Sequence, residues 1–287
     1  MHTIIFIIVC SKNVEQIDRP HNKRQNAVFL NFTKLISIMT DTQLQELYEK
    51  AQTVELSLDE RKSVLLLEHI TDYNSDVFGE GYIKSASMID KIVGYKDLAT
   101  LEDGRNEDEV QELTETIKCW GMRSKAGFSS HYEEIKQILR SIDLKDGDTF
   151  IDVGSSYGRV GSILGVNFPN VNFIGYEIVK PRLEEAQRIA ESLQLKNVKY
   201  VHANLVLETF SFQKANWFLI YNIFDDDEIT TQIIEKIAKT KEKEKEIHLI
   251  VKYTGSSKSY TESPFLELVG EGENSELLGS FWIYRFK

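Results

Sequence analysis

The alternation of short apolar runs with helical stretches in the second half of the chain restricts its fold more than any other feature. Strands that alternate with helices lie parallel, because each helix returns the chain to the end of the sheet where the next strand starts. We therefore expect an α/β fold with a doubly wound, mostly parallel sheet. The expected strands are Thr149–Val153, Val171–Tyr176, Val198–Val201, Trp217–Tyr221 and Ile247–Tyr253, and the helices between them include Arg159–Phe168, Lys180–Leu193 and Glu228–Lys239.

The last part of the chain adds two expected strands, Phe265–Gly270 and Ser280–Phe286. No helical stretch separates them, so we expect a terminal antiparallel hairpin. Together with the five parallel strands, the hairpin makes a sheet of seven strands.

A helical region precedes the predicted sheet. From Thr40 to about Gly127 the apolar residues recur at helical spacing, with helices expected over Asp41–Val54 and Ser85–Val93. The pattern predicts a helical cap over residues 39–127 and the α/β domain over residues 128–287. Helix starts are marked by capping boxes at Ser57–Glu60 and Ser130–Glu133 and by a similar signal at Asn106–Glu109.

Residues 1–38 are expected to be a disordered extension, or a start placed upstream of the true one at Met39. The apolar stretch Thr3–Cys10 is far shorter than the about 20 residues that span a bilayer. No Lys or Arg precedes this stretch and no small-residue cleavage site follows it, which argues against an export signal.

Composition excludes some classes of protein. A hydrophobic content of 41% over 287 residues suffices for a large domain with a cap. Cys10 and Cys119 cannot form a disulfide framework, so we expect a reducing, cytoplasmic location and no membrane partner. The formal net charge of −11 disfavours a nucleic-acid partner, because such binding relies on cationic side chains. The oligomeric state is left open.

The stretch Thr149–Gly161 predicts a ligand site. It reads as a strand, a turn rich in Gly and Ser, and a helix. Glycines let a ligand lie against the backbone, and the helix start offers free N–H groups. Glu177 ends the second strand, where an acidic side chain can accept both hydroxyls of a ribose; the alternative is that it only caps the next helix. Ser156–Gly161 also approximates the dinucleotide motif G-x-G-x-x-G without its first glycine, so an NAD-dependent enzyme is a second interpretation.

Read from Asp152, the sequence D-V-G-S-S-Y-G resembles motif I, D-x-G-x-G-x-G, of the class I S-adenosylmethionine-dependent methyltransferases. The order of the predicted strands and the terminal hairpin are also similar to that family. The resemblance covers roughly Phe128 to Lys287. It implies a Rossmann-like seven-stranded fold, S-adenosyl-L-methionine as cofactor, and methyl transfer as the activity, with no metal.

The resemblance implies a role for each matching residue. A loop under the methionine part of the cofactor would consist of Asp152, Gly154, Ser156 and Gly158. The ribose and adenine would contact Glu177, Ile178 and Asn204, and Asn222 would lie beside the reactive methyl. Ser156 stands where the family has its middle glycine, and Asn204 replaces the commoner Asp. These two departures leave a non-catalytic cofactor-binding module as an alternative.

The acceptor is predicted from the end of the fourth strand. Tyr221–Phe224 is similar to the Asn-then-Phe stretch of the non-SET histone-lysine methyltransferases. That resemblance implies an amine acceptor, such as a protein lysine, bound near Tyr132, Asn222 and Phe224 as catalytic residues. Tyr132 could equally fill the core. A small-molecule O- or N-methyltransferase is the alternative activity, so the expected partner is a protein or a small-molecule acceptor.

Overall fold

The structure is a computed structural model of the chain. It describes residues 39–70, 80–97, 100–101, 130–221, 223–224, 226–242, 245–252, 258–272 and 280–287. The predicted extension 1–38 and the predicted helix that starts at Asn106 lie outside the described residues. The predicted boundary between cap and α/β domain lies outside them too, so this division stays a prediction.

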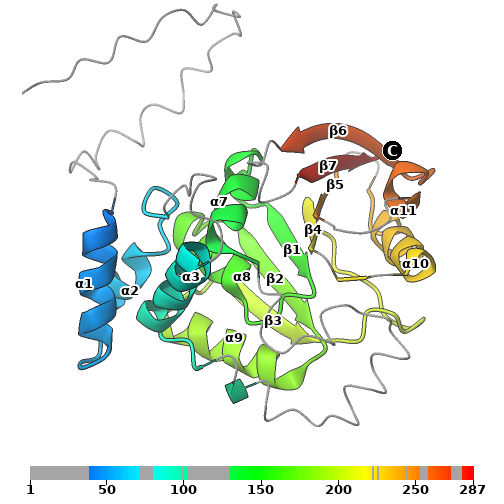
Figure 1. The fold of residues 1–287 in the computed structure, drawn as a ribbon. Helices are drawn as coiled ribbons and strands as arrows, with labels where there is room; N and C mark the ends of the chain where they lie inside the picture. The colour runs from blue at the N-terminus through cyan, green and yellow to red at the C-terminus, as the bar shows by residue number, and fades with distance from the viewer. Residues whose placement is uncertain are drawn as a thin grey trace, which may run out of the picture. The chain divides into compact units, whose positions relative to one another are not determined.

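A seven-stranded sheet with the strand order β3-β2-β1-β4-β5-β7-β6 forms the centre of the α/β part (Figure 1). Strands β1 to β5 are parallel, and β7 is antiparallel to both of its neighbours, β5 and β6. This arrangement confirms the expected fold class. The strands are β1 Thr149–Val153, β2 Asn172–Glu177, β3 Val198–His202, β4 Trp217–Tyr221, β5 His248–Lys252, β6 Leu266–Gly272 and β7 Phe281–Phe286.

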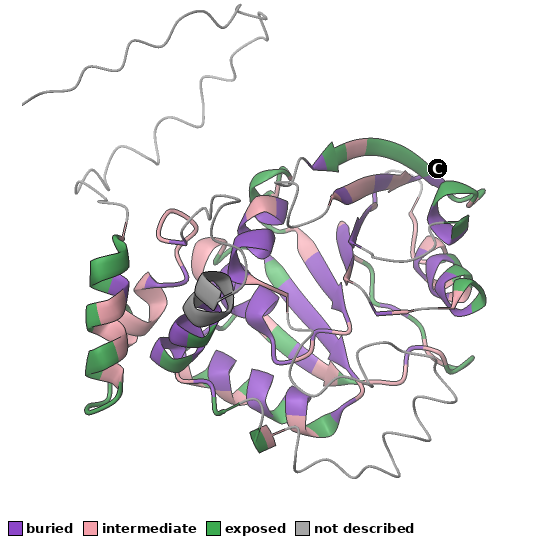
Figure 2. Ribbon diagram, in the orientation of Figure 1, coloured by how far each residue is buried: buried purple, intermediate pink, exposed green. Residues whose placement is uncertain are grey.

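Helices cover both faces of the sheet (Figure 1). One face packs against α7 (Tyr132–Arg140), α8 (Arg159–Asn167) and α9 (Lys180–Ser192), and the other against α10 (Asp227–Ala238) and the short α11 (Lys258–Thr261). Strand alternation explains the division. Phe150 of β1 belongs to the first cluster, whereas its neighbour Ile151 belongs to the second. Figure 2 shows the buried residues concentrated in the sheet and along the inner sides of these helices.

The helices before the sheet share the first of these two cores. They are α1 (Asp41–Ala51), α2 (Leu58–Ser63) and α3 (Glu80–Val93), and their apolar residues join the cluster of α7, α8 and α9. The side chain of Asn167 in α8 hydrogen-bonds to the backbone of Leu65 and Leu67 at 2.8 and 3.0 Å. The predicted cap helices within the described residues therefore pack directly onto the sheet's first helical layer.

Local signals predicted most helix starts correctly. The capping box of Ser57 and Glu60 is present at the start of α2. The predicted box of Ser130 and Glu133 is wrong by one residue, because α7 begins after His131, whose backbone N–H donates to Glu134. The shift points Glu134, rather than Glu133, toward the helix start. Among the described residues, no helix is both long and apolar enough to cross a membrane.

Candidate cofactor and acceptor site

The turn between β1 and α8 has a backbone that suits glycine. Gly154 and Gly158 have φ values of +80° and +82°, in the left-handed region that L side chains rarely adopt. Ser156, which replaces the family's middle glycine, has a φ of +49°. The N–H groups of Gly154 and Ser155 both donate to the carbonyl of Tyr176, at 2.9 and 2.8 Å. The turn is thereby fixed at the carboxyl end of β1, next to β2, where open α/β sheets bind ligands.

Close neighbours also require glycine in this turn. A Cβ on Gly158 would lie 2.4 Å from the Oη atom of Tyr200, and the Tyr200 hydroxyl donates to the Gly158 carbonyl at 2.9 Å. A Cβ on Gly154 would lie 2.7 Å from the Cδ1 atom of Ile223. The segment after β4 therefore lies against the glycine turn. Asn222, which precedes Ile223 in the sequence, lies outside the described residues.

Glu177, at the end of β2, ties the turn to the next helix. The residue is 5% exposed, and its carboxylate accepts three backbone N–H groups, from Ser156 at 2.8 Å, Ile178 at 2.9 Å and Val179 at 2.7 Å. Two of these donors, Ile178 and Val179, lie at the start of α9, so Glu177 does cap that helix. A carboxylate has about four lone-pair sites, so one site is left over for a ribose hydroxyl. The ribose role stays a prediction.

Asp152, the last residue but one of β1, is buried below the same turn. Its side chain is 3% exposed. Burial, and then the charge of Glu177, raises the pKa of Asp152 to about 8. A carboxyl group with this pKa is mostly neutral at physiological pH, and a cation placed beside it would ionise it. The α-ammonium of the methionine part of S-adenosylmethionine is such a cation, so the donor set fits that group.

A buried polar cluster that sequence reasoning missed joins α3 to the glycine turn. Asp90 of α3 accepts from Nε of Arg159 at 2.9 Å and forms an ion pair with its Nη2, and Arg159 directly follows Gly158. The Tyr132 hydroxyl donates to the same carboxylate at 2.7 Å, and the Arg159 guanidinium lies 5.2 Å from the Tyr132 ring centroid. Burial opposes ionisation, yet the Asp90 carboxylate keeps the pKa of Arg159 above its usual value.

This environment bears on the prediction that Tyr132 is catalytic. Its side chain is 3% exposed, and its hydroxyl proton is donated to Asp90. This environment fits the core interpretation of Tyr132 rather than the catalytic one.

A second missed cluster lies at the carboxyl ends of β4 and β5. Tyr221 and Lys252, paired in register on these strands, both reach Glu134 of α7. Lys252 forms an ion pair with the Glu134 carboxylate, and the Tyr221 hydroxyl donates to its other oxygen. His131, at the start of α7, lies near Lys252 and Arg159. Burial, and then these two cations, lowers the pKa of His131 to about 4.

The remaining predicted residues lie around the same edge of the sheet. Ile178 and Asn204 follow β2 and β3, and both are partly exposed. The Asn204 side-chain oxygen accepts from the backbone of Val206 at 3.1 Å, so its predicted contact with adenine stays untested. Phe224 is partly buried against the second hydrophobic core. The structure thus gathers the described members of the predicted site at the carboxyl edge of β1 to β4.

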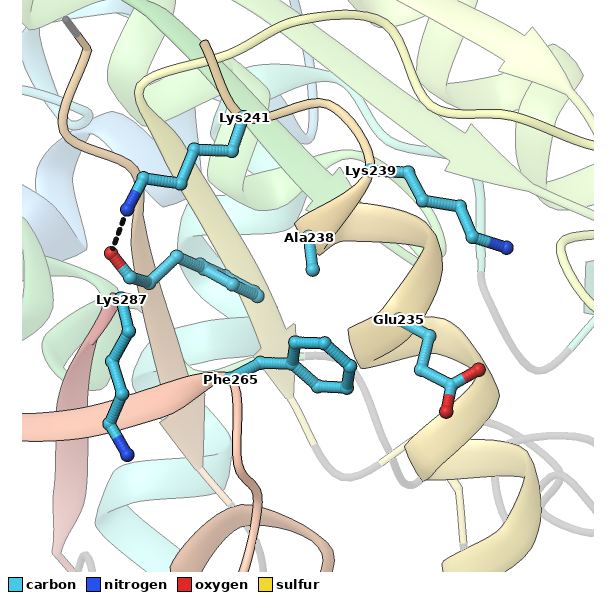
Figure 3. Close-up of a pocket in the computed structure, with 7 residues that line it drawn as sticks. Glu235, Ala238, Lys239, Lys241, Phe265 and Lys287 are labelled. Carbon is cyan, nitrogen blue, oxygen red and sulfur yellow. Dashed lines mark hydrogen bonds between the residues drawn. The ribbon is translucent and has the colours of Figure 1, made fainter. Parts of the chain in front are cut away.

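A cavity of about 450 Å³ lies at the other edge of the sheet (Figure 3). Phe265, Phe286 and the end of α10 line it, and Lys241 donates to the Phe286 carbonyl at 2.8 Å. Phe286 ends β7, which runs antiparallel to β5, so this cavity is near the start of β5. It is therefore separate from the glycine turn and from the predicted site.

Comparisons with known proteins agree with this geometry. A family model described as "Putative methyltransferase" matches residues 146–226, which contain the glycine turn, Glu177 and β4. The ribosomal RNA small subunit methyltransferase G of Porphyromonas gingivalis is 32% identical over 77 residues, which is 26% of this chain and 35% of that protein. The tRNA (guanine-N(7)-)-methyltransferase of Synechocystis sp. is 34% identical over 65 residues, which is 23% of this chain and 31% of that protein.

Among solved structures, an RNA methyltransferase from Salinibacter ruber in complex with S-adenosyl-L-homocysteine superposes with a TM-score of 0.41 at 14% identity. That match covers 55% of this chain and 92% of the other. The matched segments span about a third of the length of the curated relatives named above.

The names of these relatives contradict one expectation. The net charge of −11 disfavoured a nucleic-acid partner, yet the matching proteins are named as ribosomal RNA and tRNA methyltransferases. The inference from charge is therefore wrong as a guide to this class of protein. The strand order, the glycine turn beside Glu177 and the family match confirm the predicted resemblance of the α/β part of this chain to the class I S-adenosylmethionine-dependent methyltransferases.

Proposed function

We propose that this protein transfers a methyl group from S-adenosylmethionine to RNA. The observation that carries the proposal is the match of residues 146–226, which contain both the cofactor turn and the strand that ends at the acceptor side. The relatives that match part of this chain are named as RNA methyltransferases, and this supports RNA as the acceptor in place of a protein lysine.

The chain's residues would divide the work as follows. Gly154, Ser156 and Gly158 would carry the methionine part, with Asp152 facing its ammonium group. Glu177 would hold the ribose and orient the sulfonium, because its carboxylate is itself fixed by three N–H donors. When bound, S-adenosylmethionine supplies an electrophilic methyl group. The adenine would lie between Ile178 and Asn204, and the acceptor would approach past Asn222 and Phe224.

An acidic protein can bind RNA because binding depends on local rather than total charge. The 34 Lys and Arg residues are dispersed among 45 acidic ones, so the total says nothing about any single face. The net charge of −11 is therefore compatible with a face that contacts RNA.

Incubating the full chain with tritiated S-adenosylmethionine and purified total RNA is expected to label the RNA. The label should be released by ribonuclease and should be absent with the Glu177→Ala variant, which lacks the carboxylate beside the cofactor turn. Glu191→Ala, which changes an exposed glutamate on α9, is the matched control and should label RNA like the wild type. Label found only in protein or in small molecules would contradict an RNA acceptor.

Binding of S-adenosylhomocysteine is expected to release about one proton near pH 7, because Asp152 would lose its proton beside the bound ammonium group. Calorimetry in two buffers of different ionisation enthalpy measures this number. Asp152→Asn should abolish the release, whereas Asp143→Asn, at a site whose side chain is 82% exposed, should leave it unchanged. Equal heats in the two buffers for the wild type would contradict the prediction.

The same carboxyl group sets a pH dependence of stability. The folded protein keeps the Asp152 proton up to about pH 8, whereas the unfolded chain loses it near its ordinary pKa of about 4. The unfolded state therefore binds fewer protons across this window, and the contribution of Asp152 to the free energy of unfolding falls as pH rises. Asp152→Asn should flatten this fall in urea titrations of the protein without cofactor.

A further inference from the structure

The cluster at the ends of β4 and β5 holds a carboxylate, an ammonium and a phenol in direct contact. Glu134 and Lys252 have side chains 7% and 6% exposed, and they form an ion pair. The Tyr221 hydroxyl donates to the second oxygen of Glu134, and the Lys252 ammonium lies 5.3 Å from the Tyr221 ring centroid. Tyr221 is only partly buried. It is therefore the member of the cluster that can contact a molecule at the sheet edge.

The position of the cluster relates it to the reaction. Tyr221 immediately precedes Asn222, and Ile223 packs against Gly154 of the cofactor turn. The carbonyl of Ser130, which precedes α7, also accepts from the Arg159 side chain at 3.3 Å. Strands β1 and β4 are neighbours at the point where the strand order reverses, which is where doubly wound sheets bind ligands. The cluster thus lies on the acceptor side of this point, whereas Glu177 lies on the cofactor side.

Stability alone does not account for these residues. A buried ion pair must offset the cost of removing two charges from water, and well-packed apolar residues often stabilise a fold as well or better. Burial raises the pKa of Glu134 and lowers the pKa of Lys252, while each charge opposes the shift of the other. Buried ionisable groups of this kind are concentrated at functional sites.

We propose that Tyr221 and Glu134 are the proton outlet of the methyl transfer, and that the acceptor atom therefore carries an N–H or O–H. This inference rests on the proposed function. The acceptor lone pair forms the new bond to the methyl carbon as the carbon–sulfur bond breaks, and that electron pair stays on the sulfur of the thioether product. The acceptor then has one proton too many. Tyr221 takes this proton on its oxygen and gives its own proton to Glu134.

Lys252 has the role of a positioning residue in this scheme. Its ammonium favours the ionised form of Glu134, and it cannot itself receive the acceptor's proton because an ammonium group has no lone pair. After product release, the neutral Glu134 returns its proton through Tyr221 to water. The described charged or titratable groups that face the cluster are His131 of α7 and, beyond it, Arg159 of α8. The low pKa of His131 keeps it neutral throughout the range in which the relay works.

The test compares Tyr221→Phe and Glu134→Gln with the wild type in single-turnover transfer of tritiated methyl to total RNA. Both variants should transfer about 100-fold more slowly, with affinity for S-adenosylhomocysteine within about twofold. Their rates should rise with pH as hydroxide replaces the relay, whereas the wild-type rate should level off. Tyr95→Phe removes another buried hydroxyl, bonded to Ser162 at 3.0 Å, and should keep the wild-type rate. Wild-type rates in both relay variants would overturn the proposal and indicate an acceptor atom without a proton.

A second measurement decides the relay without any acceptor. The carboxyl ¹³C signal of Glu134, assigned with Glu134→Gln, should be that of an ionised group at about pH 7 and should shift to that of a neutral acid in Lys252→Met. A neutral Glu134 in the wild type would overturn the relay, because a protonated carboxyl cannot accept a proton. Failure of the wild type to label RNA, with Glu134 ionised, would count against the proposed RNA acceptor and leave the relay supported.

Discussion

Replacing Asp90 by alanine is expected to lower the free energy of unfolding by about 3–5 kcal/mol. The Arg159 side chain, 9% exposed, would keep its burial and lose its ion-pair partner. The Tyr132 hydroxyl would lose its acceptor at the same time. Urea titration of the full chain measures the change. Asp143→Ala, which removes an exposed carboxylate 3.9 Å from Lys145, should cost no more than about 1 kcal/mol.

A double variant separates the lost charge pair from lost packing. Asp90→Leu combined with Arg159→Met replaces both charges with apolar side chains, and it should recover most of the stability lost in Asp90→Ala. Because Arg159 follows Gly158 directly, Asp90→Ala should also weaken the binding of S-adenosylhomocysteine. A loss of less than about 1 kcal/mol in the single variant would show that Arg159 finds another partner or reaches water.

The Glu177→Ala variant is expected to bind S-adenosylhomocysteine about 100-fold more weakly, which corresponds to about 2.7 kcal/mol. Three backbone N–H groups, those of Ser156, Ile178 and Val179, would lose their charged acceptor. Bonds to a charged acceptor contribute about 1.5–3 kcal/mol each, so the turn under the cofactor would lose its fixed shape. The predicted ribose contact would disappear as well.

Calorimetric titration measures this affinity, with circular dichroism to verify the fold. Glu177→Gln keeps the shape of the side chain and removes its charge, so its affinity should lie between those of the wild type and Glu177→Ala. Glu191→Ala should bind like the wild type, because Glu191 is an exposed residue of α9. Unchanged affinity in Glu177→Ala would mean that the cofactor does not use the end of β2.

Local sequence patterns predicted the order of elements well because their causes are local. The parallel strands were predicted to within one residue at each end, and so were the starts of α1 and α2. Alternating apolar residues and capping side chains act over a few positions. The start of α7 was misplaced by one residue because Ser130 and His131 are both followed three positions later by a glutamate. The structure distinguishes them, because the His131 backbone N–H donates to Glu134.

The site was predicted in part. The glycine turn and Glu177 are motif residues with a fixed spacing, and the structure brings them into contact. Tyr200, which packs under Gly158, had no signal in the sequence. Arg159 stood inside the motif and could have been singled out as a charge at the start of a buried helix. The prediction against a nucleic-acid partner is contradicted by the names of the relatives, because total charge does not report the local surface.

The sequence by itself determined the α/β architecture and the turn at the end of β1, since periodicity and the positions of the glycines are local properties of the chain. The tertiary structure decided which charges meet. Asp90 and Arg159 are separated by 69 positions and Glu134 and Lys252 by 118. Each pair is buried between elements that are distant in the sequence, and no local pattern encodes such a contact. Charge pairing across elements depends on how the layers pack, and packing is a property of the whole fold.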